Sequence, residues 1–226
     1  MQKLGKYATT IALVMSFIGV IGASEAQQAP EKTHLLSTNA LIADDFSGIE
    51  DTIIVKAFVG WMVETRGDIT ISPPESRDQL YYDILIKGDS ANMNIFEMDL
   101  MGDARIPDPW SKNCRNTFYV IRITSSHPVI QEFDSQNRHV MAFTFVGCAY
   151  KFIAVVADRM GSEEVLYTTM LHELGHMWGL LDNKEGENSI MNGSWPGSKC
   201  ITKKDLRQTY EIRGKKGKEP KGAGCK

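Results

Sequence analysis

The sequence predicts a mixed α/β (α+β) fold for residues 47–213. A segment with helical periodicity covers residues 48–66, β-branched and aromatic segments follow between residues 68 and 157, and two more helical segments begin after Ser162 and Thr202. Because the strand-like segments lie between helical ones, a sheet covered by helices is favoured. The chain has 226 residues, 42% hydrophobic content and a net charge of −3. This composition is typical of one globular domain and excludes disordered, collagen-like and coiled-coil chains.

The N-terminal 26 residues have the features of a secretory signal peptide. Lys3 and Lys6 precede the uncharged, mostly apolar stretch 7–23, and small residues flank a cleavage site after Ala26. Cleavage after Ala23 is a second option, and a membrane anchor is disfavoured because the apolar stretch is short for a span. We therefore expect residues 1–26 to be removed. The mature protein would be secreted, periplasmic or extracellular, with no transmembrane segment.

The first structured segment is expected to begin at residue 47. Residues 27–46 are polar and are interpreted as an irregular lead-in. Ser47 and Glu50 form a capping-box pattern, which predicts a helix over residues 48–66 that ends at Gly67. The β-branched run at residues 53–55 leaves a strand possible at its start.

Strands are predicted from β-branched and aromatic runs with turn residues at their ends. Residues 68–72 form a short run that stops at Pro73 and Pro74. Residues 75–113 have no clear pattern. The remaining predicted strands are residues 117–124, 139–146 and 152–157, the last two joined as a hairpin across Gly147.

Two helices and a basic tail complete the predicted organisation. Ser162 caps a helix whose first turn is acidic, and Thr202 opens the last helix with Asp205 three residues later. Residues 214–226 are rich in Gly and Lys and are expected to be a flexible tail. From residue 199 to residue 226 there are ten Lys or Arg and three Asp or Glu. Such a tail can bind an anionic surface or can simply be solvated. We expect no nucleic-acid partner and a monomer.

The cysteine content fits an exported protein. The chain has four cysteines, an even number that permits two disulfides in an oxidising compartment. Three pairings are possible. Because Cys200 and Cys225 bracket the last helix, we favour that pair together with Cys114–Cys148.

The sequence His172-Glu173-Leu174-Gly175-His176 indicates metal chemistry. Side chains four residues apart share a helix face, so both imidazoles can bind one ion. Glu173 can then take a proton from a water molecule at the open coordination position, as in the H-E-x-x-H metalloproteases.

The residues that follow strengthen this prediction. Gly179 stands where the helix should end, and glycine adopts the sharp turn at low cost. After such a turn, the carboxylate of Asp182 can return to the same ion. Ser189-Ile190-Met191, whose methionine lies nine residues after Asp182, is a candidate turn beneath the metal.

This stretch, from His172 to Met191, resembles the metzincin zinc endopeptidases, and most closely their matrixin branch. The resemblance implies that His172, His176 and Asp182 bind one zinc ion. It implies that Glu173 is the general base and that Met191 forms a hydrophobic floor under the metal. It further implies a protein or peptide substrate bound along an edge strand at residues 139–146.

The chain departs from the family pattern at several positions. Most metzincins have a third histidine where this chain has Asp182, although the small bacterial snapalysin-type enzymes use Asp. Gly193 replaces a tyrosine ligand found in some branches, and no cysteine precedes Cys114, so the matrixin cysteine switch is absent. The alternatives to Asp182 as third ligand are Asn183, Glu185 and Glu187.

Two other functions compete with the metzincin prediction. A gluzincin-type peptidase would take Glu211 as its third ligand, but the Gly179 spacing and the Ser-Ile-Met turn argue against it. A non-enzymatic adhesion protein would have no use for Glu173.

The remaining candidate residues have weaker patterns. Calcium binding by Asp99, Asp103 and Asp108 has no EF-hand pattern to support it. Trp195 and Pro196 could line a substrate pocket or form a structural loop. His127 and His139 lack the ligand spacing of a second zinc site.

Overall fold

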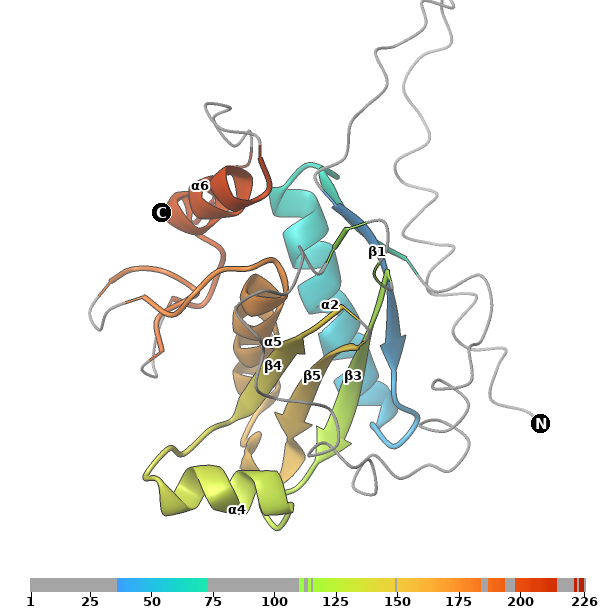
Figure 1. Cartoon of the computed structure of the whole chain (residues 1–226), viewed down its shortest axis with the longest axis vertical. Helices are drawn as coiled ribbons and strands as arrows, with labels where there is room; N and C mark the ends of the chain where they lie inside the picture. Colours follow the sequence, from blue (N-terminus) through green and yellow to red (C-terminus); the bar gives the residue numbers. More distant parts are fainter. Residues whose placement is uncertain are drawn as a thin grey trace, which may run out of the picture. The chain divides into compact units, whose positions relative to one another are not determined.

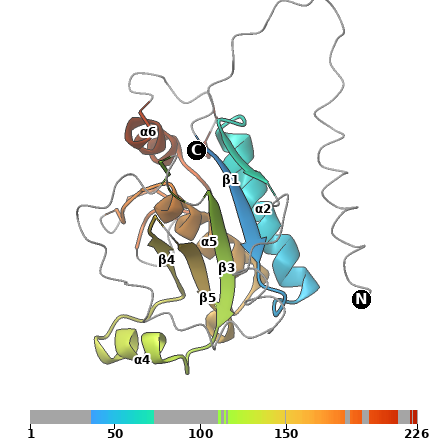
Figure 2. The same ribbon diagram turned by 45° about the vertical axis from the view of Figure 1, so that its right-hand side comes forward.

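A five-stranded sheet is the centre of the fold. The computed structural model describes residues 36–72, 110–111, 114, 116–148, 150–183, 187–193, 198–214, 222 and 224–225. Within these residues the strands are β1 (Leu36–Ile42), β2 (Ile69–Ser72), β3 (Thr117–Ile123), β4 (Ala142–Val146) and β5 (Lys151–Val156). Their order in the sheet is β2-β1-β3-β5-β4, and every neighbouring pair is parallel except β4 with β5. Figure 2 shows these strands fanning from β1 to β4.

Among the described residues, four helices accompany this sheet, and two of them pack against one of its faces. They are α2 (Gly48–Glu64), α4 (Pro128–Ser135), α5 (Glu163–Met177) and α6 (Lys203–Ile212), with a short 3₁₀ turn, η2 (Ala157–Arg159). Helices α2 and α5 pack side by side behind the sheet (Figure 1). The expected mixed α/β class is confirmed by this arrangement.

Aromatic side chains join the two central helices to the sheet. Phe58 of α2 and Trp178 at the end of α5 both pack against Phe118 of β3, edge to face, with ring centroids 5.7 and 6.1 Å apart. The indole nitrogen of Trp61 donates a hydrogen bond to the carbonyl of Leu171 at 3.0 Å, inside α5. These contacts fix α5 against α2 immediately before its histidine motif.

The predicted helix at residues 48–66 is confirmed as α2. Its capping box is complete, because the Ser47 hydroxyl accepts from the Glu50 N–H and the Glu50 carboxylate accepts from the Ser47 N–H. Arg66 and Gly67 have φ angles of 52° and 74° and end the helix. The β-branched run at residues 53–55 is therefore helical, since Ile53 and Ile54 are buried on the face toward the core.

The predicted hairpin across Gly147 is also confirmed. Strands β4 and β5 pair antiparallel, with Thr144 opposite Ile153, and the Gly147 N–H bonds to the Tyr150 carbonyl at 2.9 Å. Strand β4 lies at the edge of the described sheet, where the family resemblance places the substrate strand.

The prediction that residues 27–46 form an irregular lead-in is wrong for the second half of this segment. Residues 36–42 form β1, which lies between β2 and β3. Its sequence has no clear strand pattern because Ser37, Thr38 and Asn39 interrupt its apolar residues. Buried Thr38 is satisfied by donating its hydroxyl hydrogen to the Asn116 carbonyl at 3.1 Å, so a polar residue is tolerated in an interior strand. Residues 1–35, which include the expected signal peptide, lie outside the described residues.

Helix α4 was not predicted. Its N-cap is His127, whose ring accepts a hydrogen bond from the Val129 N–H at 3.3 Å, and Pro128 occupies the first helical position. The helix has only eight residues, too few for a clear periodic pattern.

Both favoured disulfides are present. Cys114 is bonded to Cys148 and Cys200 to Cys225. The end of the expected flexible tail is held in place, because Gly224 donates its N–H to the Glu64 carboxylate at 3.1 Å and Gly222 is buried. Within the described part of the chain, no helix has both the length and the apolar content needed to cross a bilayer.

We predict that Ser47→Ala lowers the free energy of unfolding by about 1 kcal/mol, because the first turn of α2 loses its side-chain cap. Urea denaturation measures this change. Thr52→Ala is the control, since Thr52 is exposed on the same helix and its hydroxyl donates to the Gly48 carbonyl, which satisfies none of the free N–H groups at the helix start. The effect of this change should stay within about 0.5 kcal/mol. Equal stability of Ser47→Ala and wild type would contradict the role of the cap.

Candidate metal centre

Two histidines and one aspartate converge at the C-terminal end of α5. The Nε2 atoms of His172 and His176 lie 3.2 and 3.3 Å from the same carboxylate oxygen, Oδ1 of Asp182. All three ligand atoms lie within 4.8 Å of one another. Among the described residues, this is the one group of three His, Cys, Asp or Glu side chains with the geometry to hold a metal ion together. The structure thus brings together the three ligands expected from the sequence.

The other ring nitrogen of each histidine is bound to the main chain. Nδ1 of His172 lies 2.8 Å from the Ile190 carbonyl, and Nδ1 of His176 lies 2.8 Å from the Leu180 carbonyl. A carbonyl oxygen can only accept, so in the neutral imidazole the proton is on Nδ1. The lone pair of each Nε2 is then directed toward Asp182, and three acceptors face one another. This arrangement is stable only with protons or a cation between them.

The electrostatics of the cluster favour positive charge. Burial lowers the pKa of His172 and of His176, but the hydrogen bonds with Asp182 and the negative charge of Glu173 outweigh it, so both pKa values are raised. Hydrogen bonds from the same imidazoles hold the pKa of Asp182 well below its usual range. The carboxylate is therefore ionised at neutral pH and attracts a cation to the two imidazoles.

The turn after α5 directs Asp182 back to the histidines. Gly179 has φ +96°, its N–H donates to the His176 carbonyl at 2.8 Å, and the Leu180 N–H donates to the Gly175 carbonyl at 2.9 Å. These two bonds form a Schellman motif, which requires the left-handed conformation at the glycine. The predicted helix end at Gly179 is confirmed.

Met191 packs directly against α5 at Gly175. A Cβ atom added at Gly175 would lie 2.2 Å from Sδ of Met191, so only glycine leaves room for this contact. Met191 is fully buried, and its carbonyl accepts a hydrogen bond from the Asn183 N–H at 2.7 Å. The candidate turn at residues 189–191 therefore supports both α5 and the segment that carries Asp182.

A buried carboxylate from α6 holds this turn. Asp205 accepts a hydrogen bond from the Ser189 hydroxyl and from the Ile190 N–H at 3.1 Å. It also accepts from the N–H and hydroxyl of Thr202, at 2.8 and 2.7 Å, which completes the capping box of α6. Asp205 thus caps the start of α6 and also holds Ile190, whose carbonyl orients the ring of His172.

Glu173 lies beside the cluster with its side chain nearly buried, at 5% exposure. Its carboxylate oxygen Oε2 accepts a hydrogen bond from the Thr144 hydroxyl on β4 at 2.7 Å. The same hydroxyl lies 3.0 Å from the Glu173 carbonyl. The expected general base is therefore held between α5 and the edge strand.

The alternative third ligands face elsewhere. Asn183 donates its amide to the Ser189 hydroxyl at 2.6 Å, and Glu187 pairs with Lys204. Glu211 is exposed on α6 and does not belong to the cluster of ligand atoms. Glu185 lies outside the described residues. Of the alternatives that can be placed, none replaces Asp182.

Other residues selected from the sequence have local roles or cannot be placed. His127 caps α4, and burial lowers its pKa. His139 is exposed and lies 3.6 Å from Asp134. The acidic residues considered for calcium and the Trp195-Pro196 segment lie outside the described residues.

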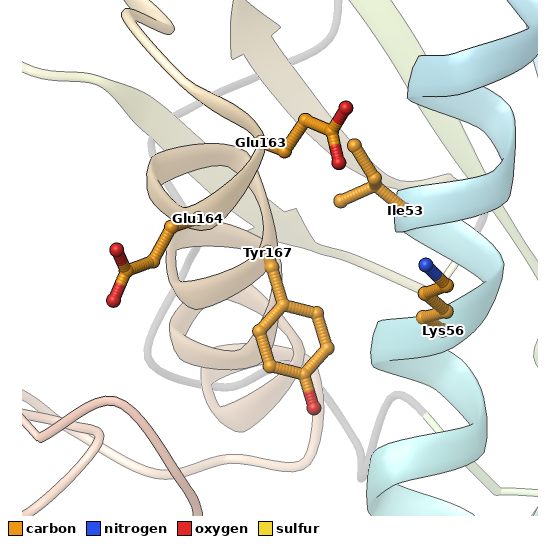
Figure 3. A pocket seen from close by; sticks show the side chains of 5 residues that line it. All are labelled: Ile53, Lys56, Glu163, Glu164 and Tyr167. Carbon is orange, nitrogen blue, oxygen red and sulfur yellow. The ribbon is translucent and has the colours of Figure 1, made fainter.

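A separate groove lies between α2 and the first turns of α5 (Figure 3). Its lining residues are Ile53, Lys56, Glu163, Glu164 and Tyr167. Burial and the charge of Glu64 raise the pKa of Tyr167, which keeps its hydroxyl protonated. None of these five residues belongs to the histidine cluster, and their charges do not converge on a common point in the figure.

Several residues that build the centre were not identified from the sequence. Thr144 and Asp205 act from strands and helices far away in the chain, and no local pattern marks such contacts. Gly175 had a signal, since a glycine inside an otherwise regular helix suggests a close approach of another segment.

Comparisons of the chain with models of protein families and with curated proteins found no match. The functional case therefore depends on the geometry of the cluster and on the local motif.

We predict that Gly175→Ala lowers the free energy of unfolding by about 1–3 kcal/mol, because the new methyl group displaces Met191. In a Met191→Ala background the same change should cost almost nothing, which a double-mutant cycle measures. Gly48→Ala is the control, since nothing lies within 4 Å of the added atom. A cost for Gly175→Ala that is independent of Met191 would contradict the packing argument.

Proposed function

We propose that this protein is a secreted zinc-dependent endopeptidase of the metzincin type. The observation that carries the proposal is the convergence of two imidazole nitrogens on one carboxylate oxygen, at 3.2 and 3.3 Å, with each opposite ring nitrogen bound to a carbonyl. Metal-binding histidines in proteins are oriented by the same kind of outer hydrogen bond.

The spacing of the ligand atoms fits zinc. Zinc binds imidazole nitrogen and carboxylate oxygen at about 2.0–2.1 Å in tetrahedral geometry, which separates neighbouring ligand atoms by about 3.3 Å. The two nitrogen–oxygen distances in the cluster agree with that value. Two neutral imidazoles and one carboxylate form a donor set that suits zinc better than calcium or magnesium, which prefer oxygen ligands.

The exposure of the ligands fits a catalytic site more than a structural one. Three protein ligands leave a fourth position for water. The Asp182 side chain is 59% exposed, whereas the histidine side chains are 19% and 24% exposed. Solvent can therefore reach the centre from the Asp182 side while α5 shields the other.

The chemistry follows from the groups beside the metal. Zinc, when bound, polarises the scissile carbonyl and makes a water molecule more acidic. Glu173 accepts the proton of that water and later delivers a proton to the leaving amine. The hydroxyl of Thr144 holds the carboxylate, and its place directly after His172 on α5 keeps Glu173 next to the centre.

The edge strand supports a peptide substrate. Strand β4 pairs with β5 on one side and lies at the edge of the described sheet, so an extended peptide can add to its free side through main-chain hydrogen bonds. Thr144 of this strand touches Glu173, which places the candidate docking edge beside the candidate base.

The site favours this function over the two competitors. A gluzincin would need Glu211 at the cluster, and that residue is exposed on α6. An adhesion protein would not need a nearly buried carboxylate next to two metal-binding histidines. The two disulfides agree with export to an oxidising compartment.

We predict that the purified protein binds one zinc ion and that zinc raises its melting temperature. At a zinc concentration 100 times the Kd, binding contributes about 2.7 kcal/mol to stability. This corresponds to a shift of roughly 5–10 °C for a domain of this size. The shift should disappear in His172→Ala and His176→Ala and should shrink in Asp182→Ala. Zinc content by mass spectrometry and thermal unfolding test this; an unchanged shift in His172→Ala would refute the ligand set.

We predict that the mature protein cleaves a mixed peptide library and that a chelator abolishes the cleavage. Glu173→Gln should keep zinc and lose activity by about 10²–10⁴-fold, because general base catalysis contributes that much. Glu187→Gln is the matched control, because Glu187 pairs with Lys204 rather than with the cluster. Zinc binding without cleavage in the wild type would favour a non-enzymatic metal site.

A further inference from the structure

The Thr144 hydroxyl donates a hydrogen bond to the carboxylate of Glu173, the candidate base. Thr144 lies in the middle of β4, opposite Ile153 of β5. Because side chains alternate along a strand, Phe143 and Phe145 point to the opposite face, where both pack against Phe152. Thr144 therefore faces α5. Its hydroxyl reaches Glu173, which directly follows His172 in that helix.

The contact is specific in its atoms. The hydroxyl lies 2.7 Å from the carboxylate oxygen Oε2 and 3.0 Å from the main-chain carbonyl of the same residue. A hydroxyl has one hydrogen to donate and two lone pairs, so it can donate to either oxygen and can also accept. Thr144 engages Oε2, so Oε1 is the carboxylate oxygen that the proposal assigns to a water molecule or substrate.

We propose that Thr144 is the positioning residue for Glu173, holding the carboxylate in one place while its proton is taken up and passed on. This inference depends on the proposed peptidase function and names a residue that the histidine motif does not contain. It explains why a threonine is used on an edge strand next to two phenylalanines.

The Thr144 hydroxyl can hold the same carboxylate oxygen before and after the proton transfer. While Glu173 is ionised, Thr144 donates its hydrogen to Oε2. After Glu173 has taken a proton from water on Oε1, Oε2 is the carbonyl oxygen of the acid and continues to accept the Thr144 hydrogen, with the Glu173 main-chain carbonyl as a second acceptor. Thr144 neither gains nor loses a proton over the cycle; the proton goes from water to Glu173 and then to the leaving amine. One side chain thus fixes the carboxyl group in both halves of the reaction.

The position of Thr144 also connects substrate docking to the base. A peptide that adds to the free edge of β4 orders the strand that carries Thr144. The substrate strand and the base are then aligned by the same residue, which reduces the number of independent motions before the reaction.

The test compares Thr144→Val, which keeps the shape and removes the hydroxyl, with Thr144→Ser, which keeps the hydroxyl. We expect Thr144→Val to lower kcat by about 10- to 100-fold with little change in KM, and Thr144→Ser to stay within about threefold of the wild type. Zinc content should be unchanged in both. Thr38→Val is the matched control, since Thr38 is a strand threonine whose hydroxyl donates to a carbonyl far from the centre.

A double-mutant cycle separates positioning from general stability. If Thr144 acts through Glu173, Thr144→Val should have no further effect on the residual activity of Glu173→Gln. A purely structural role would lower that residual activity as well. Equal kcat for Thr144→Val and wild type, or full additivity with Glu173→Gln, would overturn the proposal.

Crystal structures of the wild type, Thr144→Val and Thr144→Ser give a readout that needs no activity. The carboxylate of Glu173 should leave its place beside residue 144 in the valine variant and keep it in the serine variant. A carboxylate that stays in place without the hydroxyl would overturn the inference. Should the valine variant fail to fold, the pair Thr144→Ala and Thr144→Ser makes the same comparison. A wild-type protein that binds zinc but cleaves no peptide would refute the proposed peptidase function. The crystal structures would still show whether the Thr144 hydroxyl positions the Glu173 carboxylate.

Discussion

The contact between Met191 and Gly175 is the constraint on which the rest of the centre depends. The methionine sulfur occupies the space where any other residue at position 175 would place its Cβ atom. Because the turn lies this close to α5, the carbonyl of Ile190 reaches the ring of His172 and the carbonyl of Met191 reaches the main chain of Asn183. A wider separation would break both hydrogen bonds and would leave Asp182 free to point into solvent. The buried Asp205 fixes the same turn from its other side.

The electrostatic character of the centre follows from this packing. Each histidine donates through Nδ1 to a rigid main-chain oxygen, so each Nε2 is turned toward Asp182. The three side chains are thereby held in one arrangement, which would lower the entropic cost of binding the proposed ion. Glu173 follows His172 on α5, and the edge strand β4 adds a second support through the Thr144 hydroxyl. The position of the candidate base therefore depends on both elements.

Local sequence patterns predicted much of the architecture but little of the outer support of the site. The Ser47–Glu50 and Thr202–Asp205 spacings predicted two helix starts, because capping depends on residues three apart. The histidine spacing and Gly179 predicted that His172, His176 and Asp182 come together, since one helix face and one tight turn determine where they lie. Strand β1 was missed because Thr38 is satisfied by a residue 78 positions away. The roles of Thr144 and of Asp205 toward the turn depend on similar long-range contacts, which no single window of sequence can reveal.

The proposed function requires that His172, His176 and Asp182 bind one zinc ion. Anomalous diffraction from crystals of the protein grown with zinc, measured on both sides of the zinc absorption edge, would locate this ion. We expect a single strong peak about 2.0–2.2 Å from Nε2 of each histidine and from a carboxylate oxygen of Asp182. A zinc peak ligated by other residues, or no peak between these three side chains at saturating zinc, would contradict it.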